Sequence, residues 1–115
     1  MARYRISAQA KGDLSRIFET SLERWGVAAM TRYRALLTKA IRRAAAEPEL
    51  PASRARAELR AGIRSLHVRC AQGVGDVRAP VHVVYYRVVR LGWIEVVRVL
   101  HERMDAPRHF EDDDA

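Results

Sequence analysis

Basic side chains gather near the end of the last predicted strand of this 115-residue chain, at Arg98, His101, Arg103 and His109. Cleavage of a phosphodiester needs a base for the attacking 2′-hydroxyl, an acid for the leaving oxygen and cations for the phosphate charge. These residue types suit that chemistry, but their spacing does not specify it. His101 also fits a structural or surface histidine, and Arg98 also fits a partner for an acid across the sheet. Both interpretations stay open.

Other kinds of chemistry find no support in the residue spacing. The histidines at positions 67, 82, 101 and 109 are scattered, and the single cysteine, Cys70, has no partner at the spacing of a metal site. The sequence carries no nucleophile elbow, zinc-protease helix motif or P-loop. We therefore expect no metal and no cofactor. Cys70 is predicted to be a small core residue near the end of a strand, in a reduced, cytoplasmic protein.

The stretch from Val81 to Leu100 must position those basic side chains. It contains two runs rich in Val, Ile, Tyr and Trp, separated by Leu91-Gly92, a pattern typical of a β-hairpin. The first run is apolar on both alternations, which predicts a strand in the centre of its sheet. The second run alternates so that Glu95 and Arg98 are expected on opposite faces.

Two helices are predicted before this hairpin. After a short strand at Tyr4–Ile6, Ser7 is a suitable N-cap, and an apolar stripe with helical spacing runs from Ala8 to Trp25. Gly26 then favours a helix stop, and a second stripe begins at Val27 and ends before Pro48. Helices joined so tightly form an antiparallel hairpin. Their stripes are typical of core packing and not of a cofactor site.

The rest of the chain completes an α+β fold. We expect a connector from Pro48 to Gly62 with a short helical turn at Ala52–Leu59, a strand at Ile63–Cys70 and a long, mobile loop at Ala71–Pro80. The predicted order is an N-terminal strand, an antiparallel helical hairpin and a three-stranded antiparallel meander. Residues 1–110 are expected to form one domain, and 111–115 an acidic disordered tail.

The charge distribution predicts an anionic partner. The net charge is +7, and four of the 14 acids lie in the last five residues, so residues 1–110 carry 21 basic and ten acidic side chains, a net +11. Such a body favours nucleic acid or an acidic protein segment as partner, although a solvated basic surface remains the alternative. No signal peptide or membrane-spanning run is present in the sequence, so we expect no membrane association.

Several segments resemble one bacterial family. The matching pieces, in order, are Tyr4–Ser7, Ala10–Leu14, Glu23–Gly26, Leu59–Arg64, His82–Val88 and Val97–Asp105. Together they resemble the ParE toxins of type II toxin–antitoxin systems, in the RelE/ParE superfamily. The resemblance implies a strand, two helices and three strands in a RelE/ParE toxin-like fold. It also implies a ParD-like antitoxin in a hetero-oligomer with the toxin, and action on DNA gyrase that blocks replication. The loop at Ala71–Pro80 is longer than the usual turn of the family.

Three functions remain to be compared. The resemblance favours a non-enzymatic toxin that inhibits DNA gyrase. The RelE branch shares the fold but cleaves mRNA on the ribosome, and here His101 is followed by Glu102 and not by the tyrosine that often completes that site. A basic nucleic-acid-binding module, or a toxin without activity, is the third. We expect that His101 is not a catalytic base, since the only lysines, Lys11 and Lys39, lie in the predicted helices.

Two sets of contact residues follow as hypotheses. An antitoxin helix would lie in a groove beside the helical hairpin, with Leu22, Trp25 and Tyr33 in its wall, unless these three are purely core residues. Trp25 is also expected to be buried, so that Trp25→Ala would lower stability by ~3–5 kcal/mol. Contacts to the target are expected from Arg98, His101, Arg103, Met104 and Arg108.

Overall fold

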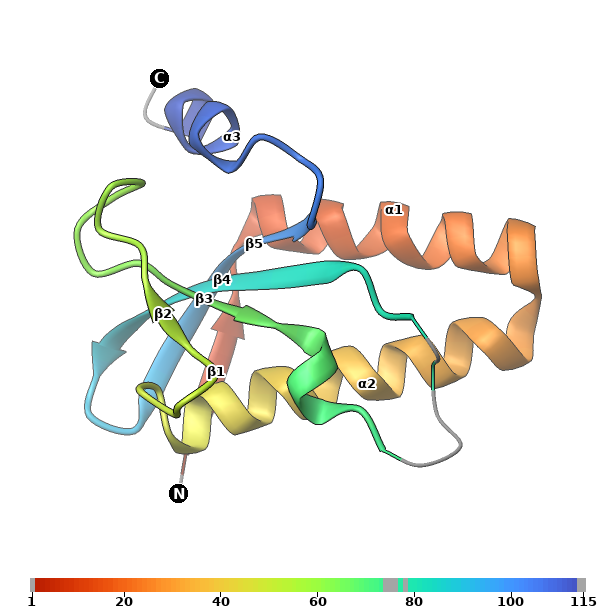
Figure 1. The fold of residues 1–115 in the computed structure, drawn as a ribbon, viewed down its shortest axis with the longest axis horizontal. Coiled ribbons are helices and arrows are strands. Elements are labelled where there is room, and N and C mark those ends of the chain that lie inside the picture. The colour runs from red at the N-terminus through yellow and green to blue at the C-terminus, as the bar shows by residue number, and fades with distance from the viewer. Residues whose placement is uncertain (1, 74–76, 78, 114–115) are drawn as a thin grey trace.

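The computed structural model describes residues 2–73, 77 and 79–113, which form an α+β fold of helices and one sheet. In chain order they are β1 (Arg3–Ile6), α1 (Ala8–Trp25), α2 (Val27–Ala46), β2 (Arg54–Ala55), β3 (Arg64–His67), the 3₁₀ helix η1 (Val68–Ala71), β4 (His82–Arg90), β5 (Trp93–His101) and α3 (Ala106–Asp113). Figure 1 shows the paired helices α1 and α2 beside the sheet, with α3 set apart from them.

The strands form one sheet in the order β1-β5-β4-β3-β2. β3, β4 and β5 are antiparallel neighbours, which confirms the predicted three-stranded meander, and β4 lies in the centre as expected. β1 joins the sheet beside β5 and runs parallel to it. The parallel pairing places the start of the chain next to its last strand, a relation that no local pattern in the sequence indicates.

Local signals set the ends of the helical hairpin. The Ser7 hydroxyl accepts a hydrogen bond from the Ala10 N–H (3.1 Å) and donates one to the Val97 carbonyl (2.9 Å), so it caps α1 and ties the helix to β5. Gly26, with φ of 88°, separates α1 from α2. This backbone region is nearly restricted to glycine. The predicted helix bounds are therefore confirmed.

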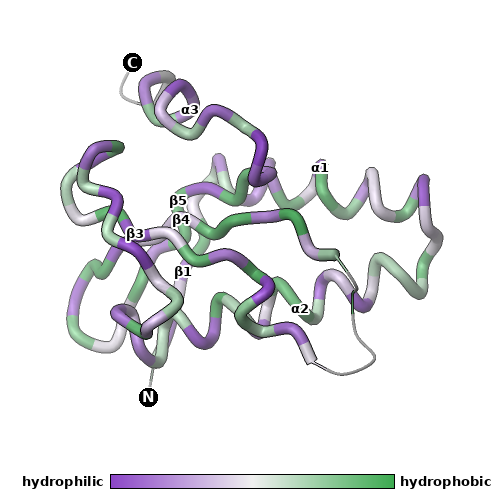
Figure 2. Tube along the Cα trace, viewed as in Figure 1, coloured by the Kyte–Doolittle hydropathy of each residue, from purple (hydrophilic) through white to green (hydrophobic). Residues whose placement is uncertain are grey.

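Apolar side chains fill both faces of the sheet. On one face, α1 and α2 pack on even-numbered residues of β4, and the core includes Leu37, Ile41, Val84 and Tyr86. On the other face, Ala106 and Phe110 of α3 pack against Tyr85, Val97 and Leu100. In Figure 2 hydrophobic residues recur along β4 and the helical hairpin, whereas hydrophilic residues dominate α3. The small helix therefore covers the second face with few apolar residues.

A β-bulge interrupts the alternation of β5. Tyr86 pairs with Val96 but Tyr85 pairs with Arg98, so Val97 is an extra residue on β5. Glu95 and Arg98 consequently lie opposite Arg87 and Tyr85, which are two residues apart on β4 and share a face. The expectation that Glu95 and Arg98 lie on opposite faces is wrong, because a bulge shifts the period of two by one residue.

The connections differ from the prediction in several places. Ala52–Leu59 forms no helical turn; Arg54–Ala55 instead pairs with β3 as an edge strand. The strand expected at Ile63–Cys70 ends at His67, and η1 takes up its last residues. In the predicted loop, residues 74–76 and 78 lie outside the described residues.

The C-terminal helix was not expected from the sequence. α3 extends through Asp113, three residues into the stretch predicted as a disordered tail, and residues 114–115 are not described. Asp105 before the helix, Pro107 in its first turn and the apolar pair Ala106 and Phe110 were the available signals. No helix within the described residues is both long and apolar enough to cross a membrane.

Candidate functional site

Arg98 is the buried member of the residues predicted to contact a target. Its guanidinium donates to both carboxylate oxygens of Asp13, from Nε to Oδ2 and from Nη2 to Oδ1, each at 2.9 Å. Arg98 is 9% exposed and Asp13 4% exposed. The guanidinium of Arg98 is therefore held by an internal ion pair with an acid, but the acid lies on helix α1 and not across the sheet.

Asp13 also accepts a backbone hydrogen bond from the edge of β5 that β1 does not cover. β1 ends opposite Val96, and beyond that point the N–H of Val99 donates to Asp13 Oδ2 (2.9 Å). Arg16, one turn further along α1, donates to Asp13 Oδ1 (2.8 Å). Asp13 is not among the site residues predicted from the sequence. The available signal was a carboxylate beside the apolar stripe of α1, where a charged residue needs a partner.

His101 organises the turn that follows β5. Its Nδ1 accepts the backbone N–H of Arg103 (3.0 Å), and its carbonyl accepts the N–H of Met104 (2.9 Å). Arg103 and Met104 are exposed in this turn, and Arg108 is exposed in α3. The structure thus places three of the five predicted target residues on an accessible junction between β5 and α3, with His101 beneath them.

Tertiary folding brings histidines from three strands together. His67 ends β3, His82 begins β4 and His101 ends β5, with His82 paired to His101 across the strands and their rings 5.6 Å apart. Tyr33 of α2 contacts His82, with 2.6 Å between its hydroxyl and Nδ1. Glu102 contacts His67 Nε2 at 2.6 Å. We call Tyr33, His67, His82, His101 and Glu102 the histidine cluster.

Hydrogen-bond partners assign the proton of each ring to Nε2. His67 Nδ1 accepts the N–H of Arg69, and His101 Nδ1 accepts the N–H of Arg103. The Tyr33 hydroxyl already accepts the Val81 N–H (3.1 Å), so its proton is directed to His82 Nδ1. In the neutral state each ring then carries its proton on Nε2 and has its lone pair engaged. The histidine cluster therefore offers no free basic nitrogen for proton abstraction.

The electrostatics of the histidine cluster agree with that assignment. Burial, reinforced by the neighbouring His101 and His67, lowers the pKa of His82 to about 4, so this ring is neutral at physiological pH. Burial raises the pKa of the Tyr33 hydroxyl, and the hydrogen bond from His67 lowers the pKa of Glu102. Within the described residues, no three His, Cys, Asp or Glu side chains are grouped to hold a metal ion.

The residues predicted to contact an antitoxin do not share one surface. Leu22 is 43% and Trp25 72% exposed near the end of the helical hairpin, but Tyr33 is 9% exposed inside the histidine cluster. The expectation that Trp25 is buried is wrong, because the hairpin extends beyond the sheet (Figure 1) and the described residues leave 72% of Trp25 exposed. Val27, which is 66% exposed, adds to the apolar end of the hairpin.

Comparisons with known proteins agree with this architecture. Residues 4–106 match the family model described as the ParE toxin of type II toxin–antitoxin system, parDE. Toxin ParE1 of Mycobacterium tuberculosis is 40% identical over 109 residues, covering 95% of this chain and 98% of the relative. Toxin ParE1 of Caulobacter vibrioides is 40% identical over 111 residues, covering 96% and 99%.

A solved structure shares the fold. A chain from the structure titled "Chromosomal ParDE TA system from P. aeruginosa" superposes with a TM-score of 0.64 at 17% identity, over 88% of this chain and 96% of that one. A helical hairpin on one face of a small mixed sheet places the chain in the class of α+β proteins with the RelE/ParE toxin-like fold. Within that class, the chain belongs to the ParE toxin family of type II toxin–antitoxin systems.

Proposed function

We propose that this protein is a cytoplasmic, non-enzymatic toxin that inhibits DNA gyrase and is neutralised by a ParD-like antitoxin. The observation that carries the proposal is family membership over residues 4–106, together with two relatives named as ParE1 toxins at 40% identity over nearly their full lengths. A ribosome-dependent endoribonuclease of the RelE type is the alternative. The histidine cluster supplies residue types that such chemistry uses.

The hydrogen-bond geometry supports a non-enzymatic action. A general base must reach its substrate with an unprotonated nitrogen. In His67 and His101 the nitrogen with the lone pair accepts a backbone N–H, and His82 is bonded to Tyr33. These contacts favour a structural role for the three rings, with His101 positioning the turn that carries Arg103 and Met104.

The proposed target surface is the junction between β5 and α3. Arg103 and Arg108 are exposed and form no ion pair with the described residues, and Met104 is 49% exposed between them in sequence. Guanidinium groups bind carboxylates and phosphates in a planar, bidentate manner. Arg98 supports this surface from below, since it joins α1 to β5 and lies 3.4 Å from the His109 carbonyl of α3 through Nη1.

The proposed antitoxin surface is the apolar end of the helical hairpin. Leu22, Trp25 and Val27 are exposed there, and an amphipathic segment of a partner would cover them with its apolar face. The excess of basic residues over the body of the toxin favours an acidic segment, since opposite charges speed association. Tyr33 is not part of this surface, because it lies 9% exposed in the core.

The target proposal is tested with purified gyrase and with cells that express the toxin. We expect the full-length protein to inhibit supercoiling by gyrase, and Arg103→Ala combined with Arg108→Ala to lose that inhibition at unchanged stability. His101→Gln should retain partial inhibition. Primer extension on cellular mRNA is the second readout. Site-specific mRNA ends without inhibition of gyrase would replace this proposal with the endoribonuclease.

The antitoxin proposal is tested by co-purification with a ParD-like antitoxin. Trp25→Ala should leave the melting temperature unchanged, because the side chain is 72% exposed, but weaken the complex by about tenfold or more. Leu91→Ala is the matched control: Leu91 is fully exposed in the β4–β5 turn, at the opposite end of the molecule (Figure 1). If the two variants bind the antitoxin with equal affinity, the hairpin end is not part of the interface.

A further inference from the structure

The outer face of α2 carries positive charge without any acidic residue. The helix Val27–Ala46 contains five basic residues and no Asp or Glu. All five, Arg32, Lys39, Arg34, Arg42 and Arg43, are exposed, while Tyr33, Leu37, Ala40 and Ala44 on the opposite side are buried. With 3.6 residues per turn, Arg32, Lys39, Arg42 and Arg43 fall within about 100° of the helix circumference, and Arg34 lies about 80° beyond Arg42. We call them the α2 basic face.

Most of these cations have no carboxylate partner. Among the described residues, Arg32, Lys39 and Arg42 form no ion pair, whereas Arg5 and Arg87 both pair with Glu95 at 3.1 Å and 3.0 Å. Two members of the α2 basic face have other contacts. The Arg34 guanidinium lies 4.8 Å from the centre of the Phe18 ring, and Arg43 donates to the Cys70 carbonyl. The face therefore retains a positive charge that the described residues do not neutralise.

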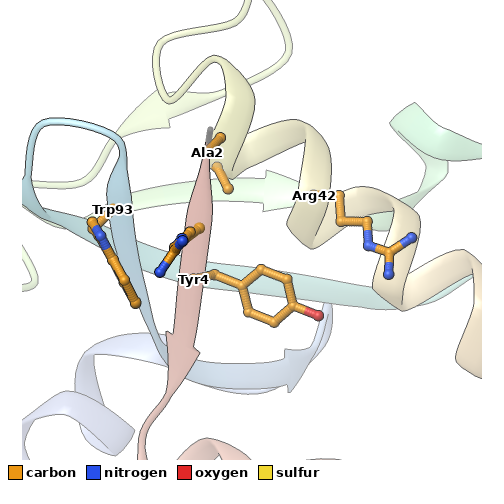
Figure 3. Close-up of a pocket in the computed structure, with 6 residues that line it drawn as sticks. Ala2, Tyr4, Arg42 and Trp93 are labelled. Carbon is orange, nitrogen blue, oxygen red and sulfur yellow. The ribbon is translucent and has the colours of Figure 1, made fainter.

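Two adjoining hollows extend this surface toward the edge of the sheet. The first, of about 600 Å³, is lined by Arg34, Ala35, Thr38, Lys39, Arg42 and Arg43, with Thr31 and Ala46 at its ends. The second, of about 450 Å³, is lined by Ala2, Arg3, Tyr4, Arg42, Ala45 and Trp93. Arg42 belongs to both. Figure 3 shows the Tyr4 side chain between Arg42 of α2 and Trp93 of β5. Among the residues that the structure describes, no acidic side chain lines either hollow.

The chemistry of the lining favours a phosphate backbone over a protein partner. A protein interface of useful affinity needs large apolar or aromatic anchors in its centre. Between its cations the first hollow offers only alanine and threonine. The large exposed apolar residues lie outside the first hollow: Leu22, Trp25 and Val27 at the hairpin end, Val88 and Leu91 near the β4–β5 turn, and Met104. The aromatic residues of the second hollow, Tyr4 and Trp93, are half-buried, and the Arg3 guanidinium lies 5.6 Å from the centre of the Trp93 ring. Arginine, which predominates here, is suited to bidentate recognition of phosphate.

The dimensions suit a double helix. Residues 32–43 of α2 span about 16 Å along the helix axis, at 1.5 Å per residue. Duplex DNA presents one charge per about 1.7 Å of its axis, so several phosphates lie within that span. We propose that the α2 basic face, continued through Arg42 to Arg3, binds the phosphate backbone of duplex DNA without reading its sequence. This inference rests on the proposed function in one respect: the proposed target, gyrase, itself holds duplex DNA.

The test is binding of the full-length protein to a short labelled DNA duplex, followed by fluorescence anisotropy over a series of salt concentrations. The triple variant Arg32→Gln, Lys39→Gln, Arg42→Gln should weaken binding equally for unrelated sequences and lower the slope of log K against log salt by about 3, because each phosphate contact contributes about 1. Circular dichroism and thermal melts establish that the variant is folded, as expected for exposed positions.

A control matched in charge is Lys11→Gln, Arg24→Gln, Arg54→Gln, which removes three exposed cations from α1 and β2, outside the proposed target surface. It should keep the wild-type slope. If both triple variants lost the same amount of DNA affinity and salt slope, the effect would be explained by net charge alone and the inference would be overturned. An unchanged slope in the α2 variant would also overturn the inference. The inference would likewise fail if polyglutamate displaced the labelled DNA as effectively as unlabelled duplex does at equal total charge.

The inference and the proposed function fail separately. DNA binding is measured without gyrase, and inhibition of supercoiling is measured on gyrase. If the protein inhibits gyrase but its binding to DNA does not depend on α2, the inference is overturned and the proposed function stands. DNA binding that depends on α2, in a protein that does not inhibit gyrase, supports the inference and overturns the function.

Discussion

Asp13 and Arg98 show how one buried ion pair can support an exposed surface. Asp13 accepts from Arg98, from Arg16 and from the Val99 N–H, so its carboxylate connects the first helix to the last strand. Arg98 also reaches the His109 carbonyl of α3. A charge removed from water needs such partners, and loss of one partner leaves the other uncompensated. Arg98 is therefore expected to affect the target surface through stability.

Arg98→Ala should lower the free energy of unfolding by about 3 kcal/mol, the low end of the usual range for a broken buried pair, because Arg16 and the Val99 N–H still hold Asp13. Chemical denaturation measures this. Arg103→Ala, an exposed position nearby, should change stability by less than about 0.5 kcal/mol. If Arg98→Ala were as stable as Arg103→Ala, the ion pair would contribute nothing and Arg98 would be free for direct contact.

The helical hairpin and α3 each depend on one residue for their position in the fold. The helical hairpin turns at Gly26, whose φ of 88° and ψ of 176° exclude other residues without strain. α3 covers the second face of the sheet through Phe110, which is 1% exposed and contacts the Tyr85 ring edge-on at 5.4 Å. The hairpin positions the proposed antitoxin surface, and α3 completes the proposed target surface.

Gly26→Ala is expected to destabilise the protein by ~1–3 kcal/mol, because alanine is strained at this backbone conformation even though its Cβ would meet no atom within 4 Å. Gly12→Ala is the paired variant. Gly12 lies inside α1 at an ordinary φ, where a Cβ would approach only the flexible Arg16 side chain at 3.5 Å. It should stabilise the helix by up to about 1 kcal/mol. Thermal melts measure both variants. A shift of the melting temperature in the same direction for Gly26→Ala and Gly12→Ala would contradict the explanation by backbone strain at Gly26.

Phe110→Ala should lower the free energy of unfolding by ~3–5 kcal/mol, the usual range for a buried phenylalanine, because its ring is packed between α3 and the sheet. Arg108→Ala, on the exposed side of the same helix, should leave stability nearly unchanged. Denaturant unfolding compares the two. A small effect of Phe110→Ala would mean that α3 does not contribute to the folded core.

At the scale of the whole molecule, the histidine cluster connects four elements. Tyr33 comes from α2, His67 from β3, His82 from β4 and His101 from β5, and their contacts lie where the three central strands end together. The low pKa of His82 means that protonation of this ring opposes folding. The cluster therefore makes the stability of the fold sensitive to acid.

Stability should fall as the pH decreases from about 6.5 to about 4. In this window the unfolded chain protonates His82, at its ordinary pKa of 6.5, while the folded state keeps it neutral down to about 4, so the unfolded state binds more protons. Glu102, whose pKa is lowered by His67, adds a loss in the same direction at the acidic end. His101, His67, Glu102 and Asp13 are the titratable groups that act on the ring.

Melting temperatures across that pH range measure the effect. His82→Gln should flatten the decline between pH 6.5 and 4, because the variant has no ring to protonate there. His109→Gln removes a histidine outside the cluster and should keep the wild-type decline. If His82→Gln showed the same decline of melting temperature with pH as the wild type, the acid sensitivity would come from other groups.

Local sequence patterns determined the helices, their ends and the central hairpin. The stripes of α1 and α2, the Ser7 cap, Gly26 and Pro48 act over a few residues, so their effect can be recognised without knowing what packs against them. The two apolar runs around Leu91-Gly92 likewise determined β4 and β5. The resemblance to ParE toxins also followed from these segments in their order along the chain.

Only the tertiary structure decided which residues are accessible. Asp13 and Arg98 are 85 residues apart in the chain, and the pairing of β1 with β5 brings them together. Periodicity marks Trp25 and Tyr33 as members of apolar stripes, but it does not say where the sheet stops: Tyr33 lies over the sheet and is buried, whereas Trp25 lies beyond it and is exposed. The bulge at Val97 and the meeting of three histidines also depend on strand register, which is a property of pairs of strands and not of any one segment.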